Sequence, residues 1–81
     1  MGSITYYVAM AFERDGEGEL IALEPMEVRS PSAAVSRAKT LAATKAGAVA
    51  FARTGDPDLG EFQDAVVLFK AGEVPDDATT G

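Results

Sequence analysis

A single helix-forming stretch, Ser30 to Gly47, constrains the fold of this chain more than any other segment. Ser30 is a good N-cap, because its hydroxyl can accept a hydrogen bond from a free N–H group of the first turn. Pro31 suits the first helical position, where no N–H is needed. Gly47 is expected to end the helix in a left-handed conformation, with Lys45 in the last turn, where a cation favours the helix dipole. The stretch therefore predicts one complete helix.

Small apolar residues repeat at three- and four-residue spacing along this stretch and predict one buried helix face. They are Ala34, Val35, Ala38, Leu41, Ala42 and Ala46. Because the stripe is nearly all alanine, the helix can approach its partner closely. A helix of about 16 residues is about 24 Å long, enough to cross a four-stranded sheet about 15–20 Å wide. A sheet is thus the expected partner.

Two strand-like segments precede the helix. Residues 4–13 alternate between two apolar rows and are rich in β-branched and aromatic residues, which is typical of a strand. The turn at residues 14–18 contains Asp-Gly, a hairpin signal, and leads into a return strand at 19–23. Pro25 cannot donate to a ladder and marks a bulge or an edge, after which residues 26–29 can resume pairing.

Two more strands follow the helix, at residues 48–54 and 65–71, joined by a polar loop. The predicted class is therefore α+β, with the order ββαββ and a four-stranded, mainly antiparallel sheet that carries one helix on one face. We expect residues 1–74 to form a single domain. Residues 75–81 are acidic and short of apolar residues, which predicts a disordered tail.

The face of the sheet opposite the helix is also predicted to be apolar. If Tyr6, Val8 and Met10 point toward the helix, the alternate row points away from it, and it is not polar either. One helix covers only one face, and an exposed apolar face of this extent usually marks an interface. The predicted interface residues are Tyr7, Ala9, Ala11, Val66 and Leu68. We expect this face to join two copies of the chain in a homodimer.

The charge distribution divides the chain into three parts. The net charge is −6, yet residues 28–55 contain five cations and no acid, whereas the segments on either side are acidic. One interpretation is internal charge complementarity with a solvated helix face. The other is a basic face, formed by Arg37, Lys39 and Lys45, that docks an acidic protein partner. The net charge argues against general nucleic-acid binding; a nucleic-acid accessory role of segment 29–53 stays an alternative.

No residue pattern indicates catalysis. The chain has no cysteine and no histidine, which excludes thiolate and imidazole chemistry. The acidic loop Asp56, Asp58, Glu61 and Asp64 lacks the order of a calcium-binding EF-hand loop, whose sixth position is glycine. We therefore expect no metal, no cofactor and no enzymatic activity. The absence of a signal-peptide pattern and of an apolar run of 18 residues predicts a cytoplasmic protein without membrane contact.

The layout resembles small bacterial ββαββ proteins of unknown function. Their pattern is a strand hairpin, a Ser-x-x-Ala-x-x-x-Ala-x-x-Leu-Ala helix and Gly-Ala at the third strand. The matching positions here are Ser30, Ala33 or Ala34, Ala38, Leu41, Ala42 and Gly47-Ala48. Residues 4–46 are also similar, more weakly, to the N-terminal domain of HicB-type antitoxins, in Tyr7-Val8, Asp15-Gly16 and the alanine helix. That likeness implies toxin binding and dimerisation. The chain departs from it, because no DNA-binding module follows residue 72 and strand two lacks a Pro-Gly-Cys-like turn.

Overall fold

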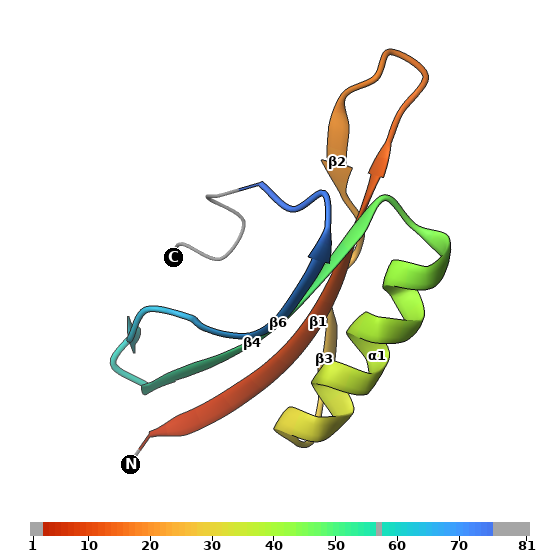
Figure 1. Cartoon of the computed structure of the whole chain (residues 1–81). Coiled ribbons are helices and arrows are strands. Elements are labelled where there is room, and N and C mark those ends of the chain that lie inside the picture. The colour runs from red at the N-terminus through yellow and green to blue at the C-terminus, as the bar shows by residue number, and fades with distance from the viewer. Residues whose placement is uncertain (1–2, 57, 76–81) are drawn as a thin grey trace.

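The computed structural model describes residues 3–56 and 58–75, which form one helix and a curled antiparallel sheet (Figure 1). The fold is α+β, as predicted. The elements, in chain order, are β1 (Ile4–Arg14), β2 (Leu20–Ala22), β3 (Met26–Val28), α1 (Pro31–Thr44), β4 (Gly47–Asp56), β5 (Glu61–Phe62) and β6 (Val66–Gly72).

The six strands lie in four rows. β1 and β4 form the centre and pair antiparallel from Ile4 opposite Gly55 to Phe12 opposite Gly47. β2 and β3 both pair with the other edge of β1, and β5 and β6 both pair with the other edge of β4. The prediction of four strands is thus correct in part: each outer strand is broken into two. One break contains Pro25, where the sequence indicated it, and the other spans residues 63–65.

The start of the helix is as predicted, and its end is not. Ser30 is the N-cap, its hydroxyl oxygen accepts from the Ala33 amide at 3.1 Å, and Pro31 occupies the first turn. The helix stops at Thr44, and Lys45 is its C-cap, in an extended conformation with φ −114° and ψ 172°. Lys45 therefore lies just past the last turn rather than in it. The Lys45 amide donates to the Leu41 carbonyl at 2.9 Å.

Gly47 is a strand residue and not a left-handed helix terminator. It begins β4, and its φ is not positive. A side chain there would place Cβ 2.6 Å from both the backbone nitrogen and the carbonyl carbon of Glu73. Glycine is required at this position because the segment after β6 passes directly over it, and the prediction of a positive φ is wrong.

The centre of the core is made of alanine. Fully buried alanines of the helix pack against fully buried alanines of β1 and β4, and Val49 is the largest completely buried side chain among the described residues. The alanines are Ala9, Ala34, Ala38, Ala48 and Ala50. Small side chains on both surfaces let the helix axis lie close to the sheet, as the alanine stripe predicted.

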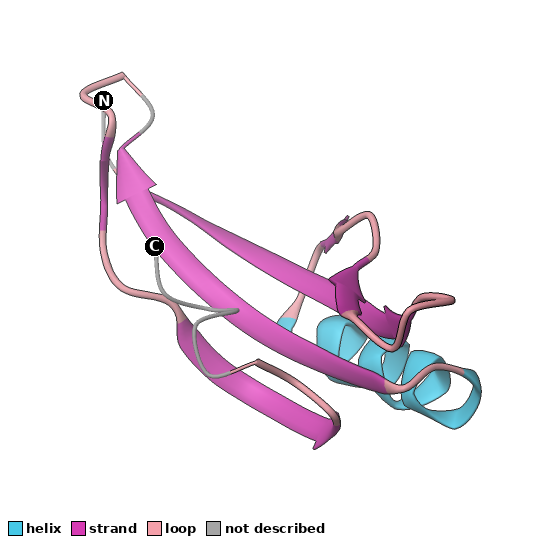
Figure 2. Cartoon of the chain, turned by 90° about the horizontal axis from the view of Figure 1, so that it is seen from above, coloured by secondary structure: helices cyan, strands magenta, loops and turns pink. Residues whose placement is uncertain are grey.

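The helix covers only one side of the sheet. Figure 2 shows it against one end of the long curved strands, while β5 and the paired ends of β1 and β4 extend beyond it. The molecule is correspondingly elongated, with extents of 44 × 24 × 17 Å. The predicted disordered tail, 75–81, lies outside the described residues except for Pro75, which is half-buried.

Candidate interaction surface

The helix lies on the opposite row of β1 from the one predicted. Ala9 and Ala11 are 0% and 2% exposed, and Tyr7 packs against the alanine cluster under the helix. Their predicted place on a face that the helix does not reach is wrong. The physical reason is size: an alanine-lined helix packs best against an alanine-lined row, and the bulkier row of Tyr6 and Val8 would hold it away.

The two predicted interface residues of β6 have different positions. A β-bulge lies between the pairs Ala50–Phe69 and Phe51–Val67, so Leu68 is the extra residue on β6. Leu68 and Phe69 both pack against the core cluster. The placement of Leu68 on an exposed interface is therefore wrong, and the bulge is what redirects it. Val66 is 61% exposed, but it lies opposite Ala52, which in turn lies opposite Tyr7 on the helix side of the sheet. Its predicted place on the face opposite the helix is therefore also wrong.

We call the sheet surface opposite the helix the far face. Residues directly opposite each other in an antiparallel pair lie on the same side of a sheet, and the strand pairings define the members of this face. Its apolar members are Ile4, Tyr6, Val8, Met10, Phe12, Leu20, Ala22, Val49, Phe51, Phe62 and Val67. The far face thus holds many of the large apolar side chains of the described residues, whereas the helix-covered face holds the buried alanines, with Tyr7, Val28, Leu68 and Phe69 packed around them.

Burial of the far face changes along its length. At the end near the β1–β2 turn, Phe12 is 2% exposed and Val49 is fully buried. At the other end, Ile4 and Phe62 are 46% and 44% exposed, and Val67, opposite Phe51 at the edge of the middle of the sheet, is 46% exposed. The exposed end is also the end that projects beyond the helix. An apolar surface in this position has neither the helix nor another described element over it.

The exposed end carries an aromatic cluster with one cation. The rings of Tyr6 and Phe62 lie 6.2 Å apart between centroids, tilted by 41°. The guanidinium carbon of Arg53 lies 5.7 Å from the Phe62 centroid, and Arg53 Nε donates to the Gln63 carbonyl at 3.2 Å. Phe62 covers Gly55, where an added Cβ would lie 2.6 Å from the Phe62 Cγ. The cluster combines two aromatic rings with one cation and is therefore partly polar.

A shallow hollow of about 190 Å³ adjoins this cluster. Its lining residues are Ser3, Gly55, Asp56, Glu61, Phe62 and Gln63. Pockets that enclose small molecules usually measure about 300–1,000 Å³. This end of the molecule therefore suits contact with another surface better than it suits enclosure of a ligand.

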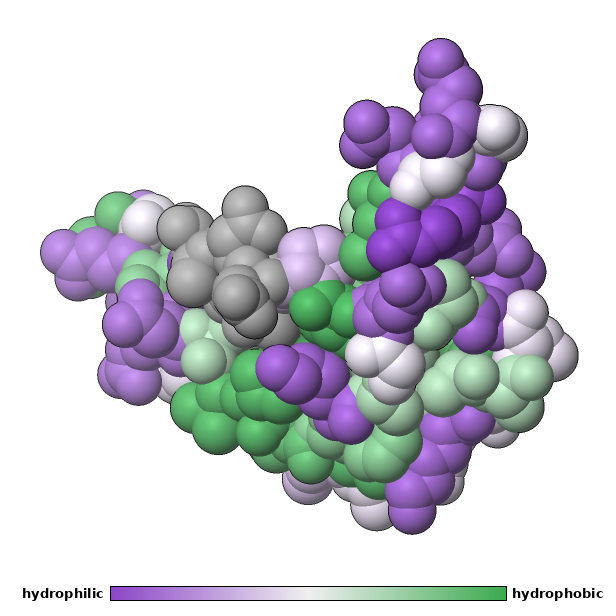
Figure 3. Space-filling view, turned by 45° about the horizontal axis from the view of Figure 1, so that its top comes forward, coloured by the Kyte–Doolittle hydropathy of each residue, from purple (hydrophilic) through white to green (hydrophobic). Residues whose placement is uncertain are grey.

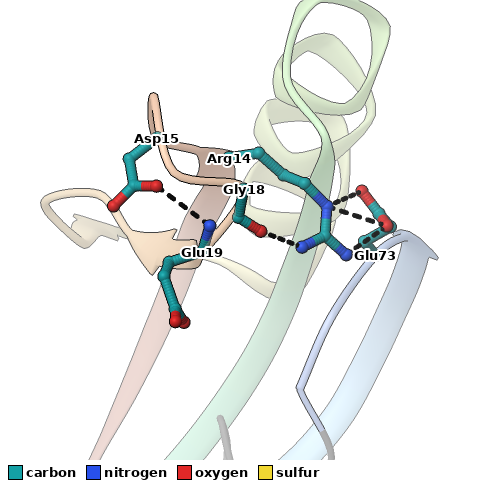
Figure 4. A network of polar contacts seen from close by, with 5 residues as sticks. All are labelled: Arg14, Asp15, Gly18, Glu19 and Glu73. Atoms are coloured by element: carbon teal, nitrogen blue, oxygen red, sulfur yellow. Dashed lines mark hydrogen bonds and ion pairs between the residues drawn. The ribbon is translucent and has the colours of Figure 1, made fainter.

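An ion pair between Arg14 and Glu73 lies at the buried end of the far face. In Figure 4, Arg14, at the end of β1, reaches Glu73, just after β6. Arg14 Nη2 lies 2.7 Å from Glu73 Oε1, Arg14 Nε donates to both carboxylate oxygens at 3.2 Å, and Arg14 Nη1 donates to the Gly18 carbonyl. The hydrogen bonds from Arg14 lower the pKa of the Glu73 carboxyl, and the same contact raises the pKa of the guanidinium. Both side chains are exposed, so solvent weakens their attraction.

The turn beside Arg14 is organised by Asp15. Its Oδ1 atom accepts from the amides of Glu17 and Glu19, each at 2.9 Å (Figure 4 shows the bond to Glu19). Gly18 has a positive φ of 81°, which suits glycine. The Asp-Gly hairpin signal is confirmed, and it places Gly18 within reach of Arg14.

The predicted basic face is only partly available to a binding partner, because two of its three cations contact other residues of the chain. Lys39 Nζ lies 5.8 Å from the ring centroid of Phe69, and Lys45 Nζ lies 3.3 Å from Glu13 Oε1. Arg37 is exposed on the helix. Two of the three cations thus contact the sheet, which fits internal charge complementarity. Docking of an acidic partner on this face stays a prediction.

The acidic loop is organised as a turn. The Asp56 carboxylate accepts from the Asp58 amide at 3.0 Å, and Gly60 adopts a positive φ of 70°. Over residues 3–56 and 58–75, no group of three or more acidic side chains is arranged to hold a metal ion. Within the same ranges, the single helix is too short to cross a bilayer.

Comparison of the chain with protein-family models, with curated proteins and with solved structures gives no match. The resemblances to ββαββ proteins and to antitoxin domains therefore stay predictions.

Sequence reasoning missed Phe51, Phe62 and Arg53 as members of the exposed surface. The signal was present in the strand alanines. Ala48, Ala50 and Ala52 alternate with Val49, Phe51 and Arg53 along β4, as small and large residues alternate along β1. Matching the alanine stripe of the helix to these alanine rows would have identified the far face correctly.

Proposed function

We propose that the chain is a homo-oligomeric interaction module without catalytic activity, which pairs as a twofold dimer through the far face. The observation that carries this proposal is the set of large apolar side chains on the side of the sheet that the helix leaves open, of which Ile4, Phe62 and Val67 are about half exposed. A single chain leaves these three in contact with water, whereas a second copy would bury them.

The shape of the chain supports the same proposal. A compact chain of this length has a radius of gyration of about 11.7 Å, whereas the value here is 13.1 Å. A chain of 8.4 kDa exposes about 4,600 Å² when compact, whereas this one exposes 5154 Å². An excess of this kind is expected of a subunit rather than of a self-sufficient monomer.

The sheet as a whole has the dimensions of a modest contact surface. Two central strands and two outer rows, each broken into two short strands, give roughly 400–500 Å² in projection, of which the end at Phe12 and Val49 is already buried. The side chains that project from it raise the accessible area toward the value of about 800 Å² per partner that is usual in stable complexes. A twofold contact needs only one such self-complementary patch on each chain.

The test is the solution mass of the chain and of charge-introducing variants. We expect a dimer at micromolar concentration by sedimentation velocity. Phe51→Glu should weaken the dimer about 30-fold or more, the effect of a central apolar residue in an interface. Thr40→Glu adds the same charge on the exposed side of the helix and should change the dimer less than about threefold.

A second variant separates association from folding. Phe62→Glu alters a residue that is already 44% exposed, so circular dichroism should report an intact fold while the dimer weakens. A wild-type monomer at tens of micromolar would refute the proposal. A dimer that tolerates both far-face variants would do the same.

A further inference from the structure

Unlike charges lie on the two sides of the far face. Glu27 lies in β3 opposite Val8, and Lys70 lies in β6 opposite Val49. Because Val8 and Val49 belong to the far face, both charged side chains project from it. Both are exposed, and within residues 3–56 and 58–75 neither forms an ion pair. The two outer rows are three strand spacings apart, about 14 Å, so these charges do not pair within one chain.

The two central strands separate these charges with apolar and aromatic side chains and one cation. Val8 pairs with Phe51 beside Glu27, and Tyr6 pairs with Arg53 one residue pair further along. In Figure 3 hydrophobic surface gathers over β6, with hydrophilic surface at its border. The far face thus has an acid on one side, a cation on the other side and a second cation between them.

Two sheets in aligned face-to-face contact can be related by a twofold axis that runs across the strands or along them. An axis across the strands places each strand over its own copy, so that β3 faces β3 and β6 faces β6. In the middle of the exposed surface, such an axis brings Glu27 close to Glu27 of the second copy and Lys70 close to Lys70. Like charges that meet in an interface oppose association.

An axis along the strands has the opposite consequence. When it runs between β1 and β4, β1 of each copy lies over β4 of the other, and β3 lies over β6. Glu27 then faces Val67 of the second copy, and Lys70 lies one residue pair further along β6, an offset of about 7 Å that the two long side chains can span. Arg53 faces the ring of Tyr6, an attractive contact between a cation and an aromatic ring.

The axis along the strands also brings together the exposed ends of the two far faces. It leaves each position along a strand beside the same position of the second copy, so the ends that carry Ile4 and Phe62 meet. The ends at Phe12 and Val49 are already buried within each chain and add little. An axis across the strands instead turns the exposed end of one copy toward the buried end of the other.

We propose that the twofold axis of the dimer runs along the strands between β1 and β4, so that Glu27 of each copy pairs with Lys70 of the other. This inference rests on the far-face dimer proposed above and specifies how the second copy is oriented. The symmetry forms the ion pair twice, once on each side of the apolar centre. Because both pairs lie at the rim, they select the orientation and add little to the affinity.

Cross-linking between two different positions tests the direction of the axis. The chain has no cysteine, so Glu27→Cys and Val67→Cys each introduce one thiol, both at exposed positions. In the proposed dimer, position 27 of one copy faces position 67 of the other across about 10 Å, whereas two copies of either position lie about 17 Å apart. A bis-maleimide that spans only the shorter distance is added to an equal mixture of the two variants. Thr40→Cys, on the helix, reports random collision.

We expect the covalent heterodimer, identified by its mass, to form at least about tenfold faster than either covalent homodimer, because the linker cannot span the longer distance. A homodimer of Glu27→Cys or of Val67→Cys that forms as fast as the heterodimer would overturn the proposed axis. A heterodimer that forms no faster than cross-links to Thr40→Cys would do the same.

Charge exchange tests the ion pair by a second route. Glu27→Lys places two lysines together at both sides of the contact, and Lys70→Glu places two glutamates there. Each single variant should weaken the dimer about threefold or more, and the double variant should restore it to within about twofold. Arg37→Glu, the same charge change on the exposed side of the helix, should change the dimer less than about twofold. A double variant that associates no better than the single variants would overturn the pairing.

Sedimentation of the same samples separates failure of this inference from failure of the proposed function. A wild-type monomer removes both, because no second copy is then present to be oriented. A wild-type dimer that is weakened by Phe51→Glu but cross-links through identical positions leaves the far-face contact in place and overturns only the axis.

Discussion

The two faces of this sheet differ in side-chain size and therefore in what they can contact. The face under the helix is lined with alanines that are fully buried, such as Ala9 and Ala50. The far face is lined with tyrosine, phenylalanine, methionine and valine, and its outer end is about half exposed. Small side chains allow two elements to approach closely, whereas large ones supply most of their apolar area to whatever covers them. The difference teaches that the best-packed face of a small domain need not be its most hydrophobic one.

The largest effect is expected where the close approach of helix and sheet is broken. Ala38 is completely buried between α1 and the sheet. Ala38→Leu should lower the free energy of unfolding by about 3 kcal/mol, because the helix must move away to accommodate three more carbons. Urea denaturation measures this change. Ala43→Leu, at an exposed position of the same helix, should change it by less than about 0.5 kcal/mol. Equal effects at the two positions would show that the helix does not pack as described.

A somewhat smaller effect is expected at Gly47, where β4 passes under the residues after β6. Gly47→Ala should cost about 2 kcal/mol, because the added Cβ overlaps the backbone of Glu73 and a backbone cannot turn aside as a side chain can. Gly16→Ala is the control, since an added Cβ meets nothing within 4 Å there. Thermal melts of both variants provide the comparison, and a neutral Gly47→Ala would contradict the close approach.

On the far face, truncation of an exposed aromatic side chain should lower the stability of the folded monomer only modestly. Phe62→Ala removes a ring that is 44% exposed and that covers Gly55. In dilute solution we expect a loss of about 1 kcal/mol, since much of the ring is already in water. The loss should grow with protein concentration if a second copy covers the ring, because association stabilises the folded state by mass action. Denaturation midpoints at two protein concentrations measure both quantities.

The smallest effect on stability is expected at the ion pair between Arg14 and Glu73, at the buried end of the far face. Arg14 lowers the pKa of the Glu73 carboxyl below its ordinary value of about 4.5. The unfolded chain therefore binds this proton more readily than the folded chain. The pair contributes its full stabilisation above that ordinary value and loses it as the pH falls through the lowered pKa.

Glu73→Gln should accordingly remove a small part of the pH dependence of stability below about pH 4.5 and leave the slope at neutral pH unchanged. Melting temperatures of wild type and variant between about pH 3 and pH 7 give this comparison. The prediction fails if the two curves remain parallel throughout the acid range.

Much of the local structure could be predicted because it depends on neighbouring residues. The N-cap at Ser30, the turn at Asp15 and the break at Pro25 each follow from the chemistry of one side chain and its adjacent backbone. The bulge at Leu68 could not be predicted in this way. It depends on how β6 aligns with β4, a strand that begins about twenty residues earlier in the chain.

The sequence by itself determined that β1 has two rows, that one helix follows an N-cap at Ser30, and that both sides of the sheet are apolar. Only the tertiary structure decided which row the helix covers and why Gly47 must be glycine. Strand alternation separates residues into two sets with a period of two, but it assigns neither set to a partner. That assignment depends on matching side-chain sizes across two layers and on the path of a segment that is distant in sequence, and both exist only once the chain has folded.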